Sequence, residues 1–296
     1  MPGWDVHTHL IPPTVLDAAR QGRFGLSIDD GTLVVDGRAR LPMRRMASPQ
    51  ALLEWVDAQD LDGAIVSIPP PLFRYELGAA WAELVNEGLR QLAGPRLRVL
   101  GHLVLVDPGM AESLAGEGVF SGFALGTPGF TERDELWQVL HELKAFTLIH
   151  PSHCDDPRLA PYYLSNLLGN PYETALAVAE LVFGDVPARF PGIRFCLCHG
   201  GGATAAVAGR WQRGVDTDRP GVEPLGLSIA EALRRFYVDD LVHDPAVLAL
   251  LAEIFGPDKV LTGSDWPFPM GADSIDRDRA ERRALEVEVF TRPLGN

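Results

Sequence analysis

Short apolar runs alternate along the chain with longer segments that have helical periodicity. Eight runs have the nearly continuous apolar character of strands that are buried on both faces. They cover residues 3–7, 63–68, 98–104, 122–126, 146–150, 194–199, 235–238 and 260–263. Such alternation is typical of βαβ units and a parallel sheet. Eight strands with interleaved helices therefore predict a (β/α)8 barrel.

Local signals place several of the helices. Ser48-Pro49 and Asp244-Pro245 each put a capping side chain and a proline in front of an apolar stripe, which is the pattern of a helix N-terminus. Gly256-Pro257 is expected to end the second of these helices. Residues 75–92 and 171–183 have the same helical period.

One region breaks the alternation. About 40 residues separate the first strand from the helix at Ser48, whereas a βα loop usually has about 2 to 6. Residues 26–35 predict a hairpin that turns at Asp30-Gly31. Loops at the carboxyl ends of the strands build the active site of a barrel, so an insertion at about residues 20–46 is expected over its mouth. The arginines of this insertion either line the pocket or form a solvated basic loop: Arg38, Arg40, Arg44 and Arg45.

Polar residues with metal-binding side chains end four of the predicted strands. These residues are His7 and His9 on the first strand, His150 on the fifth, His199 on the sixth and Asp265 after the eighth. His7 and His9 point to one side because side chains alternate along a strand. Imidazole and carboxylate suit zinc and other first-row metals.

The order of these residues favours one metal site over separate structural histidines and a capping aspartate. We predict that His7, His9, His150 and Asp265 are the ligands. His199 is either a fifth ligand or a base. Because four ligands are already available, we assign it as the catalytic base.

The composition of the chain limits the number of domains, the partners and the compartment that we expect. The 296 residues suit one barrel domain, since such barrels commonly reach about 250 residues, and we predict a single domain over 1–296. The net charge of -14 argues against nucleic acid as a partner. Three cysteines favour a reducing cytoplasm. No segment resembles a signal peptide or a membrane span, so we expect a cytoplasmic protein without a membrane partner.

Several motifs together resemble a known family, the metal-dependent amidohydrolase superfamily, and within it the aminocarboxymuconate semialdehyde decarboxylase branch. The resemblance runs from residue 4 to about residue 271. Its main motifs are His7-Thr-His9-Leu-Ile-Pro12, His150-Pro151, Cys198-His-Gly-Gly-Gly202 and Gly263-Ser-Asp265-Trp-Pro-Phe-Pro-Met-Gly271.

The resemblance implies a distorted barrel and a homodimer. It also implies a zinc ion held by His7, His9, His150 and Asp265, with His199 assisting a water molecule. Two arginines in that branch hold substrate carboxylates, one from the insertion and one donated by the second subunit. Counting back from Ser48-Pro49 assigns the first to Arg40, and the distance from the glycine run assigns the second to Arg210. The planar guanidinium fork suits a carboxylate.

The implied activity is a zinc-dependent decarboxylation of an unsaturated or aromatic-derived (di)carboxylic acid, such as an aminocarboxymuconate semialdehyde-like compound. No dinucleotide or phosphate-binding glycine motif is present, and no organic cofactor is expected. The alternatives are a metal-dependent hydrolase or hydratase of an amide, ester, lactone or enol, and a non-catalytic metal-binding protein. Relatives usually continue beyond the position of Asn296 into a final helix, which leaves the closure of the barrel open.

Overall fold

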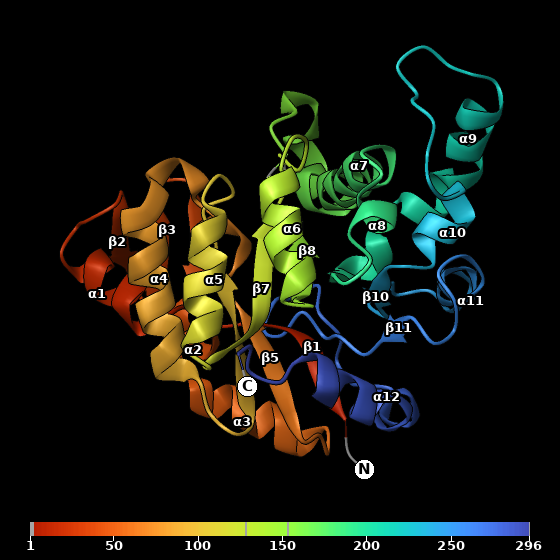
Figure 1. Cartoon of the computed structure of the whole chain (residues 1–296). Helices are drawn as coiled ribbons and strands as arrows, with labels where there is room; N and C mark the ends of the chain where they lie inside the picture. Colours follow the sequence, from red (N-terminus) through yellow and green to blue (C-terminus); the bar gives the residue numbers. More distant parts are fainter. Residues whose placement is uncertain (1–2, 128, 153, 296) are drawn as a thin grey trace. The chain divides into compact units, whose positions relative to one another are not determined.

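Eight parallel strands form one sheet in the order β1-β5-β6-β7-β8-β9-β10-β11. The computed structural model in Figure 1 describes residues 3–127, 129–152 and 154–295. The strands are β1 (Trp4–His9), β5 (Gly63–Ser67), β6 (Leu97–His102), β7 (Phe120–Gly126), β8 (Phe146–His150), β9 (Arg194–Leu197), β10 (Tyr237–Asp239) and β11 (Val260–Leu261). Helices lie between consecutive strands of this sheet. The fold is a (β/α)8 barrel, and all eight predicted strands are confirmed.

The helices begin where the capping signals predict. Ser48 Oγ accepts from the Ala51 N–H at 3.1 Å, and Asp244 Oδ1 accepts from the Ala246 N–H at 2.7 Å. The segment predicted to be helical from residue 75 opens with a 3-10 turn, η2 (Tyr75–Leu77), before α4 begins. The helices are α1 (Pro13–Arg20), α2 (Met43–Met46), α3 (Pro49–Ala58), α4 (Gly78–Leu92), α5 (Pro108–Gly116), α6 (Asp134–Glu142), α7 (Asn170–Phe183), α8 (Val186–Arg189), α9 (Thr204–Asp216), α10 (Ile229–Leu233), α11 (Pro245–Ile254) and α12 (Arg277–Phe290).

The chain forms two compact units. The first comprises Met1–Leu125 and Thr262–Asn296, and the second comprises Gly126–Leu261. The expectation of a single domain over residues 1–296 stays a prediction. No helix in the described part of the chain is both long and apolar enough to cross a membrane.

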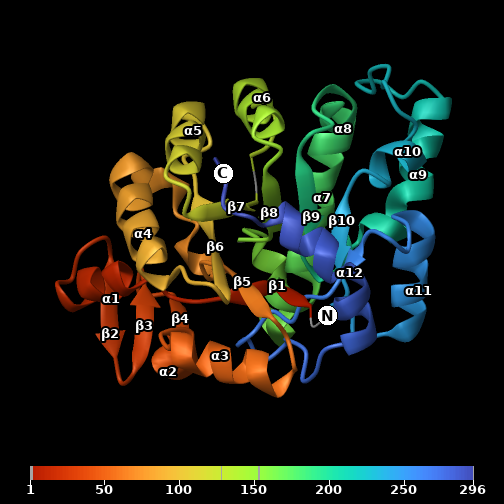
Figure 2. The same cartoon turned by 60° about the horizontal axis from the view of Figure 1, so that its bottom comes forward.

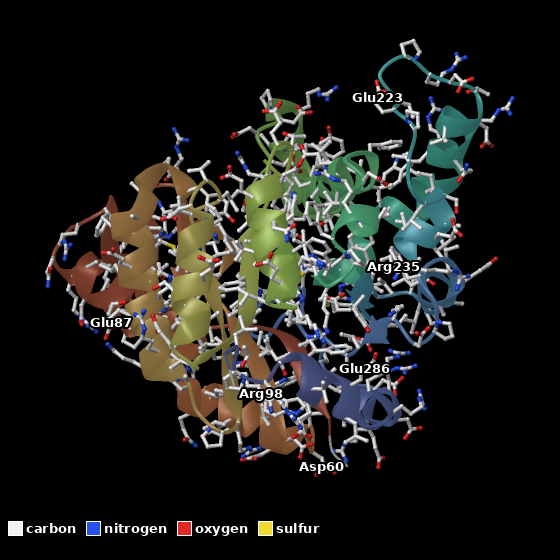
Figure 3. All side chains as sticks on the ribbon, viewed as in Figure 1. Asp60, Glu87, Arg98, Glu223, Arg235 and Glu286 are labelled. Atoms are coloured by element: carbon white, nitrogen blue, oxygen red, sulfur yellow. The ribbon has the colours of Figure 1, made fainter. Side chains whose placement is uncertain are left out.

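In the first unit, the segment that follows β11 returns to β1. The Val6 N–H donates to the Thr262 carbonyl at 2.9 Å, and Thr8 forms a parallel bridge with Trp266. Helix α12 then packs against β1. Arg98 of β6 donates to Thr291 Oγ1 at 2.6 Å, just beyond the end of α12 (Figure 3). A helix, α12, therefore follows the last strand of the sheet and packs beside its first strand.

The insertion of the first unit is a three-stranded antiparallel sheet (Figure 2). Strands β2 (Leu26–Asp29) and β3 (Thr32–Val35) form the predicted hairpin, with Asp30 and Gly31 at positive φ. The third strand, β4 (Ala39–Pro42), pairs with β3 and was not predicted. Its four residues contain one inward apolar side chain, Leu41, so its sequence pattern is weak.

The second unit contains β8 to β11 and α6 to α11. Its core includes an aromatic cluster in which Phe195 lies 5.7 Å from Trp137 and 5.6 Å from Phe236, measured between ring centroids. These rings are buried and join α6, β9 and the residue before β10. The cluster packs beside the short strands β9 and β10, at whose ends His199 and Asp239 lie.

Candidate metal centre

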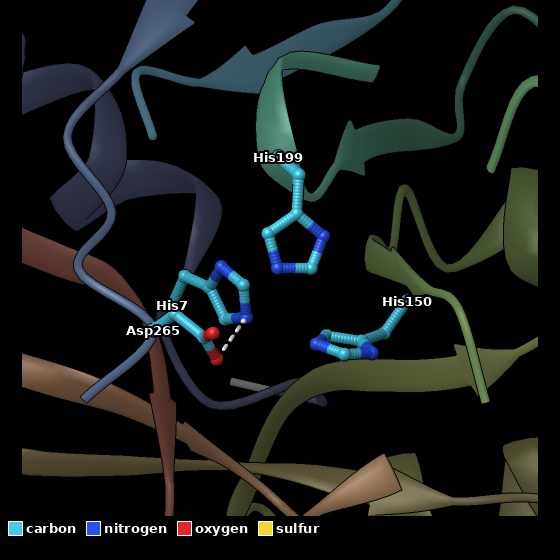
Figure 4. A group of neighbouring side chains, drawn as sticks. All are labelled: His7, His150, His199 and Asp265. Atoms are coloured by element: carbon cyan, nitrogen blue, oxygen red, sulfur yellow. Dashed lines mark ion pairs between the residues drawn. The ribbon is translucent and has the colours of Figure 1, made fainter. Parts of the chain in front are cut away.

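Three predicted ligands of the first unit bring their donor atoms together. His7 Nε2 and His9 Nε2 lie 3.0 Å apart, and they lie 3.3 and 3.0 Å from the same oxygen, Asp265 Oδ1. Figure 4 draws the His7–Asp265 pair. Around an ion with bonds of about 2.1 Å, neighbouring ligand atoms lie about 3.0 to 3.5 Å apart. The three atoms therefore have the spacing of one face of a coordination shell.

The local backbone explains this convergence. The pairing of β1 with β5 slips between Asp5 and Thr8, and a bulge of this kind redirects side chains. Asp265 has a left-handed backbone with φ 57°, which few residues other than glycine adopt. Its N–H donates to the His7 carbonyl at 2.8 Å, and the His9 N–H donates to the Trp266 carbonyl at 2.8 Å. Paired backbones thus hold the three side chains side by side.

The protonation of His9 suits metal binding. Its Nδ1 lies 3.1 Å from the Ile68 carbonyl, which can only accept a hydrogen bond, so Nδ1 carries the proton. Nε2 then keeps its lone pair, as a metal ligand must. Burial lowers the pKa of His9, despite the opposing effect of Asp265. Burial therefore favours the neutral form of this imidazole.

The buried carboxylate of Asp5 accepts hydrogen bonds from residues next to these three side chains. It accepts from the His7 N–H at 3.2 Å, from the Ser264 N–H at 3.0 Å, from Ser264 Oγ at 2.5 Å and from Trp55 Nε1 at 3.1 Å. Burial raises the pKa of Asp5, while these hydrogen bonds lower it. No role is predicted for Asp5 from the residue pattern alone. Its position two residues before His7 on the same strand was the available signal.

The second unit carries the other two predicted site residues. His150 ends β8, and its Nδ1 lies 2.7 Å from the Pro151 carbonyl, so Nδ1 donates and Nε2 keeps the lone pair. The His199 ring follows β9, and its centroid lies 5.2 Å from that of His150 with the ring planes 74° apart (Figure 4). His150 is buried, whereas His199 is partly exposed. The two imidazoles are close enough to act on the same molecule.

A second aspartate, Asp239 at the end of β10, organises the His199 loop. Its Oδ2 accepts from the His199 N–H at 3.0 Å, and its Oδ1 accepts from the N–H groups of Gly200 at 2.8 Å and Leu241 at 3.3 Å. His199 and Gly200 have φ 55° and 63°. A Cβ on Gly200 would lie 2.4 Å from Val242 Cγ1, so the glycine is required there. The sequence analysis did not assign a role to Asp239.

The predicted arginines differ in what they contact within their own units. The Arg40 guanidinium pairs with Asp29 Oδ2 at 2.6 Å, and both side chains are more than half exposed. Arg45 instead lies with its guanidinium 5.0 Å from the ring centre of Trp266, the residue after Asp265. Arg210 is exposed on α9 of the second unit. Arg45, and not Arg40, is therefore seen to contact the segment that carries the predicted ligand Asp265.

Comparison with known protein families identifies the class of protein to which the chain belongs. The chain matches the amidohydrolase model over residues 4–291, and it belongs to this family. The resemblance inferred from the sequence motifs is thereby confirmed.

Curated relatives point to one type of reaction. The chain is 28% identical over 300 residues to 2-amino-3-carboxymuconate-6-semialdehyde decarboxylase of Dictyostelium discoideum, covering 90% of this chain and 82% of the relative. It is 27% identical to 6-methylsalicylic acid decarboxylase of Penicillium expansum, covering 89% and 84%. These relatives are consistent with a carboxy-lyase.

Solved structures share the fold. A 5-carboxyvanillate decarboxylase from Novosphingobium aromaticivorans, complexed with manganese and 4-hydroxy-3-methoxy-5-nitrobenzoic acid, matches with a TM-score of 0.74. The match covers 100% of this chain and 94% of that chain at 19% sequence identity. The similarity establishes the architecture, in which strand ends carry the active site.

Proposed function

We propose that the protein is a metal-dependent decarboxylase of an unsaturated or aromatic-derived carboxylic acid. His7, His9, His150 and Asp265 would hold one divalent cation, and His199 would serve as the proton-transfer group. The convergence of two imidazole nitrogens and one carboxylate oxygen within 3.3 Å carries the proposal. The two curated relatives described above support decarboxylation, because each is named for loss of a carboxyl group.

The donor set fits a first-row cation. Three neutral imidazoles and one carboxylate suit zinc, and manganese accepts such mixed nitrogen and oxygen ligands. When bound, a divalent cation supplies Lewis acidity toward an oxygen of water or substrate, which is worth several kcal/mol. The carbonyls of Ile68 and Pro151 keep the lone pairs of His9 and His150 available for it.

His199 suits the transfer of a proton. Its main chain is fixed by Asp239, while its ring is partly exposed. An imidazole can take up and release a proton near neutral pH. It would accept a proton from water or a substrate hydroxyl and return it to the carbon that loses carbon dioxide. The electron pair of the broken C–C bond then ends in a new C–H bond, and no redox partner is needed.

Arginines would bind the carboxylate groups of the substrate. Arg210 on α9 is exposed in the single chain, and we propose that it reaches the site of a second subunit in a homodimer. For the arginine of the insertion there are two candidates. Arg40 is already paired with Asp29, whereas Arg45 lies over Trp266 beside Asp265. We propose Arg45 for this role and keep Arg40 as the alternative.

Metal removal and restoration test the function. The purified protein is stripped with a chelator, reloaded with zinc or manganese, and assayed for carbon dioxide release from muconate-like acids, 6-methylsalicylate and dihydroxybenzoates. We expect release only by the metal-loaded protein. Full activity of the stripped protein would refute the metal assignment. Turnover of esters, lactones or amides without carbon dioxide release from any acid would instead identify a hydrolase built on the same residues.

A further inference from the structure

A buried histidine outside the predicted ligand set, His102, ends β6 in the first unit. Only 2% of its surface is exposed. Its position at the carboxyl end of a barrel strand places it at the level where barrel enzymes bind substrate.

The side chain of His102 points away from the outer helices. A Cβ on Gly101 would lie 3.2 Å from Leu114 of α5, so position 101 faces that helix. Side chains alternate along a strand, and position 102 therefore faces the opposite side of the sheet. Arg98, four residues earlier on that same side, lies 4.0 Å over the Trp4 ring of β1. His102 thus lies on the face of the sheet opposite to α5.

One loop connects His102 to the metal-binding histidines. The end of β5 and the segment after it provide the Ser67 hydroxyl and the Ile68 carbonyl that contact His9 Nδ1. The same segment continues to Tyr75, whose ring stacks on His102 with centroids 5.4 Å apart and planes 15° apart. Parallel strands lie about 4.8 Å apart, so β6 is about 10 Å from β1. A substituted ring bound at the histidines of β1 would lie beside this wall.

One ring nitrogen of His102 is available for a further hydrogen bond. Its main-chain N–H and carbonyl are both bonded to the Asn86 side chain at 2.8 Å. Its Nδ1 is buried and has no hydrogen-bond partner among residues 3–127, 129–152 and 154–295. Buried polar atoms nearly always have a partner, and a neutral imidazole offers one donor and one acceptor. A hydroxyl group, which also donates and accepts, is the matching partner.

We propose that His102 is a specificity-determining residue that hydrogen-bonds a hydroxyl substituent of the substrate, with Tyr75 stacked on its ring. This inference rests on the proposed function, because it names the class of acid that the same site would select. Hydroxylated aromatic or enolic acids would be preferred over acids of equal size that carry a methyl group at that position.

Binding of two unreactive ligands tests the inference without relying on turnover. 2-Nitroresorcinol and 3-methyl-2-nitrophenol differ by one hydroxyl against one methyl, and neither has a carboxylate to lose. Titration calorimetry is performed with the metal-loaded wild type and with His102→Phe and His102→Gln. We expect the wild type to bind the dihydroxy ligand about tenfold more tightly, as one neutral hydrogen bond allows. His102→Phe should remove this preference, and His102→Gln should restore part of it.

The controls separate a binding role from a structural one. Metal content and thermal unfolding show whether each variant is folded and loaded, and the Asn86 bonds involve only the main chain of residue 102. A wild type without the preference, or one that binds neither ligand, would overturn the inference, and so would a His102→Phe protein that retains the preference. Carbon dioxide release by the wild type is measured separately, and its absence would count against the proposed decarboxylase alone.

Discussion

Two buried aspartates, Asp5 in the first unit and Asp239 in the second, hold the candidate site residues in different ways. Asp5 accepts from main chain, hydroxyl and indole donors on β1, α3 and the segment after β11. Asp239 accepts from main-chain N–H groups of two loops. The first carboxylate joins regular elements, and the second fixes the conformation of a glycine-rich loop.

This difference predicts that changes around Asp5 and changes around Asp239 affect different properties of the enzyme. The residues around Asp5 are donors with the spacing of a metal shell, so damage there should appear first in metal binding. The loop around Asp239 carries His199 in a left-handed conformation, so damage there should appear first in proton transfer. Metal content and the rate of turnover can therefore test the two regions separately.

The largest effect is expected for Asp265→Ala. This change removes the oxygen that His7 and His9 share, and with it the Lewis acid. We expect metal content to fall below one equivalent per ten subunits and activity to fall by about 10³-fold or more. Elemental analysis and the carbon dioxide assay measure both. Asp273→Ala, an exposed aspartate in the same segment, is the control, and equal behaviour of the two variants would contradict the assignment.

His199→Gln should separate catalysis from metal binding. Glutamine keeps a polar side chain but cannot relay a proton, and the loss of a positioned general base costs about 10² to 10⁴ in rate. We expect full metal content with this loss of turnover. If the variant instead loses metal as Asp265→Ala does, His199 belongs to the ligand set.

Acid should weaken the first unit through His102, whose pKa burial lowers to about 3. Below about pH 6.5 the imidazole is protonated in the unfolded chain but stays unprotonated in the folded protein. The free energy of unfolding therefore falls by about 1.4 kcal/mol for each pH unit below 6.5. Asp5 acts oppositely, because its raised pKa lets the folded protein take up a proton first. Urea unfolding at pH 6.5 and 4.5 should show a smaller loss for His102→Phe than for the wild type. Equal losses would show that the folded protein accommodates the charged imidazole.

The two aspartates can be compared directly by Asp5→Asn and Asp239→Asn. Loss of an outer partner of a metal ligand typically costs about 10- to 100-fold. We expect Asp5→Asn to weaken metal affinity by such a factor, measured with a competing chelator. Asp239→Asn should keep the metal affinity and lower kcat, because the amide repels one of the N–H groups that orient the His199 loop. If both variants lower metal affinity, or both lower only kcat, the two aspartates do not have the separate roles predicted here.

The smallest effects concern the arginines of the insertion. Arg45→Ala should raise KM by about tenfold, since a charge-assisted hydrogen bond to a carboxylate is worth about 1.5 kcal/mol or more. Arg40→Ala removes an exposed ion pair, which contributes about 0 to 1 kcal/mol of stability, and should leave KM within about twofold. Steady-state kinetics of the two variants decides between them, and the reverse ranking would restore Arg40 as the substrate residue.

The strands, and the convergence of His7, His9 and Asp265 at their ends, could be predicted because their signals are local. Apolar runs mark all eight strands, and the capping residues Ser48 and Asp244 mark two helix starts. The roles of the two aspartates could not be predicted in the same way. The bonds of Asp5 to Ser264 join residues 259 positions apart, and those of Asp239 to His199 join residues 40 apart. Such partners are set by the folded sheet and not by spacing along the chain.

The arginines show a further limit of sequence reasoning. Counting from Ser48-Pro49 selected Arg40, but the structure contains an unpredicted strand, β4, in which Arg40 pairs opposite Val34 and bonds to Asp29. Arg45 follows β4 and contacts Trp266. Which arginine approaches Asp265 therefore depends on a strand whose sequence pattern is too short to recognise.

The bond between Asp5 and Ser264 has a consequence for biosynthesis. At about 5 to 20 residues per second, a ribosome needs roughly 13 to 52 s to travel the 259 residues between them. During that interval the nascent chain carries His7 and His9 without Asp265, and Asp5 has not yet met its Ser264 partner. At the proposed metal site, loading would then be a late event of maturation, and a translation product that ends before Asp265 should not retain the ion.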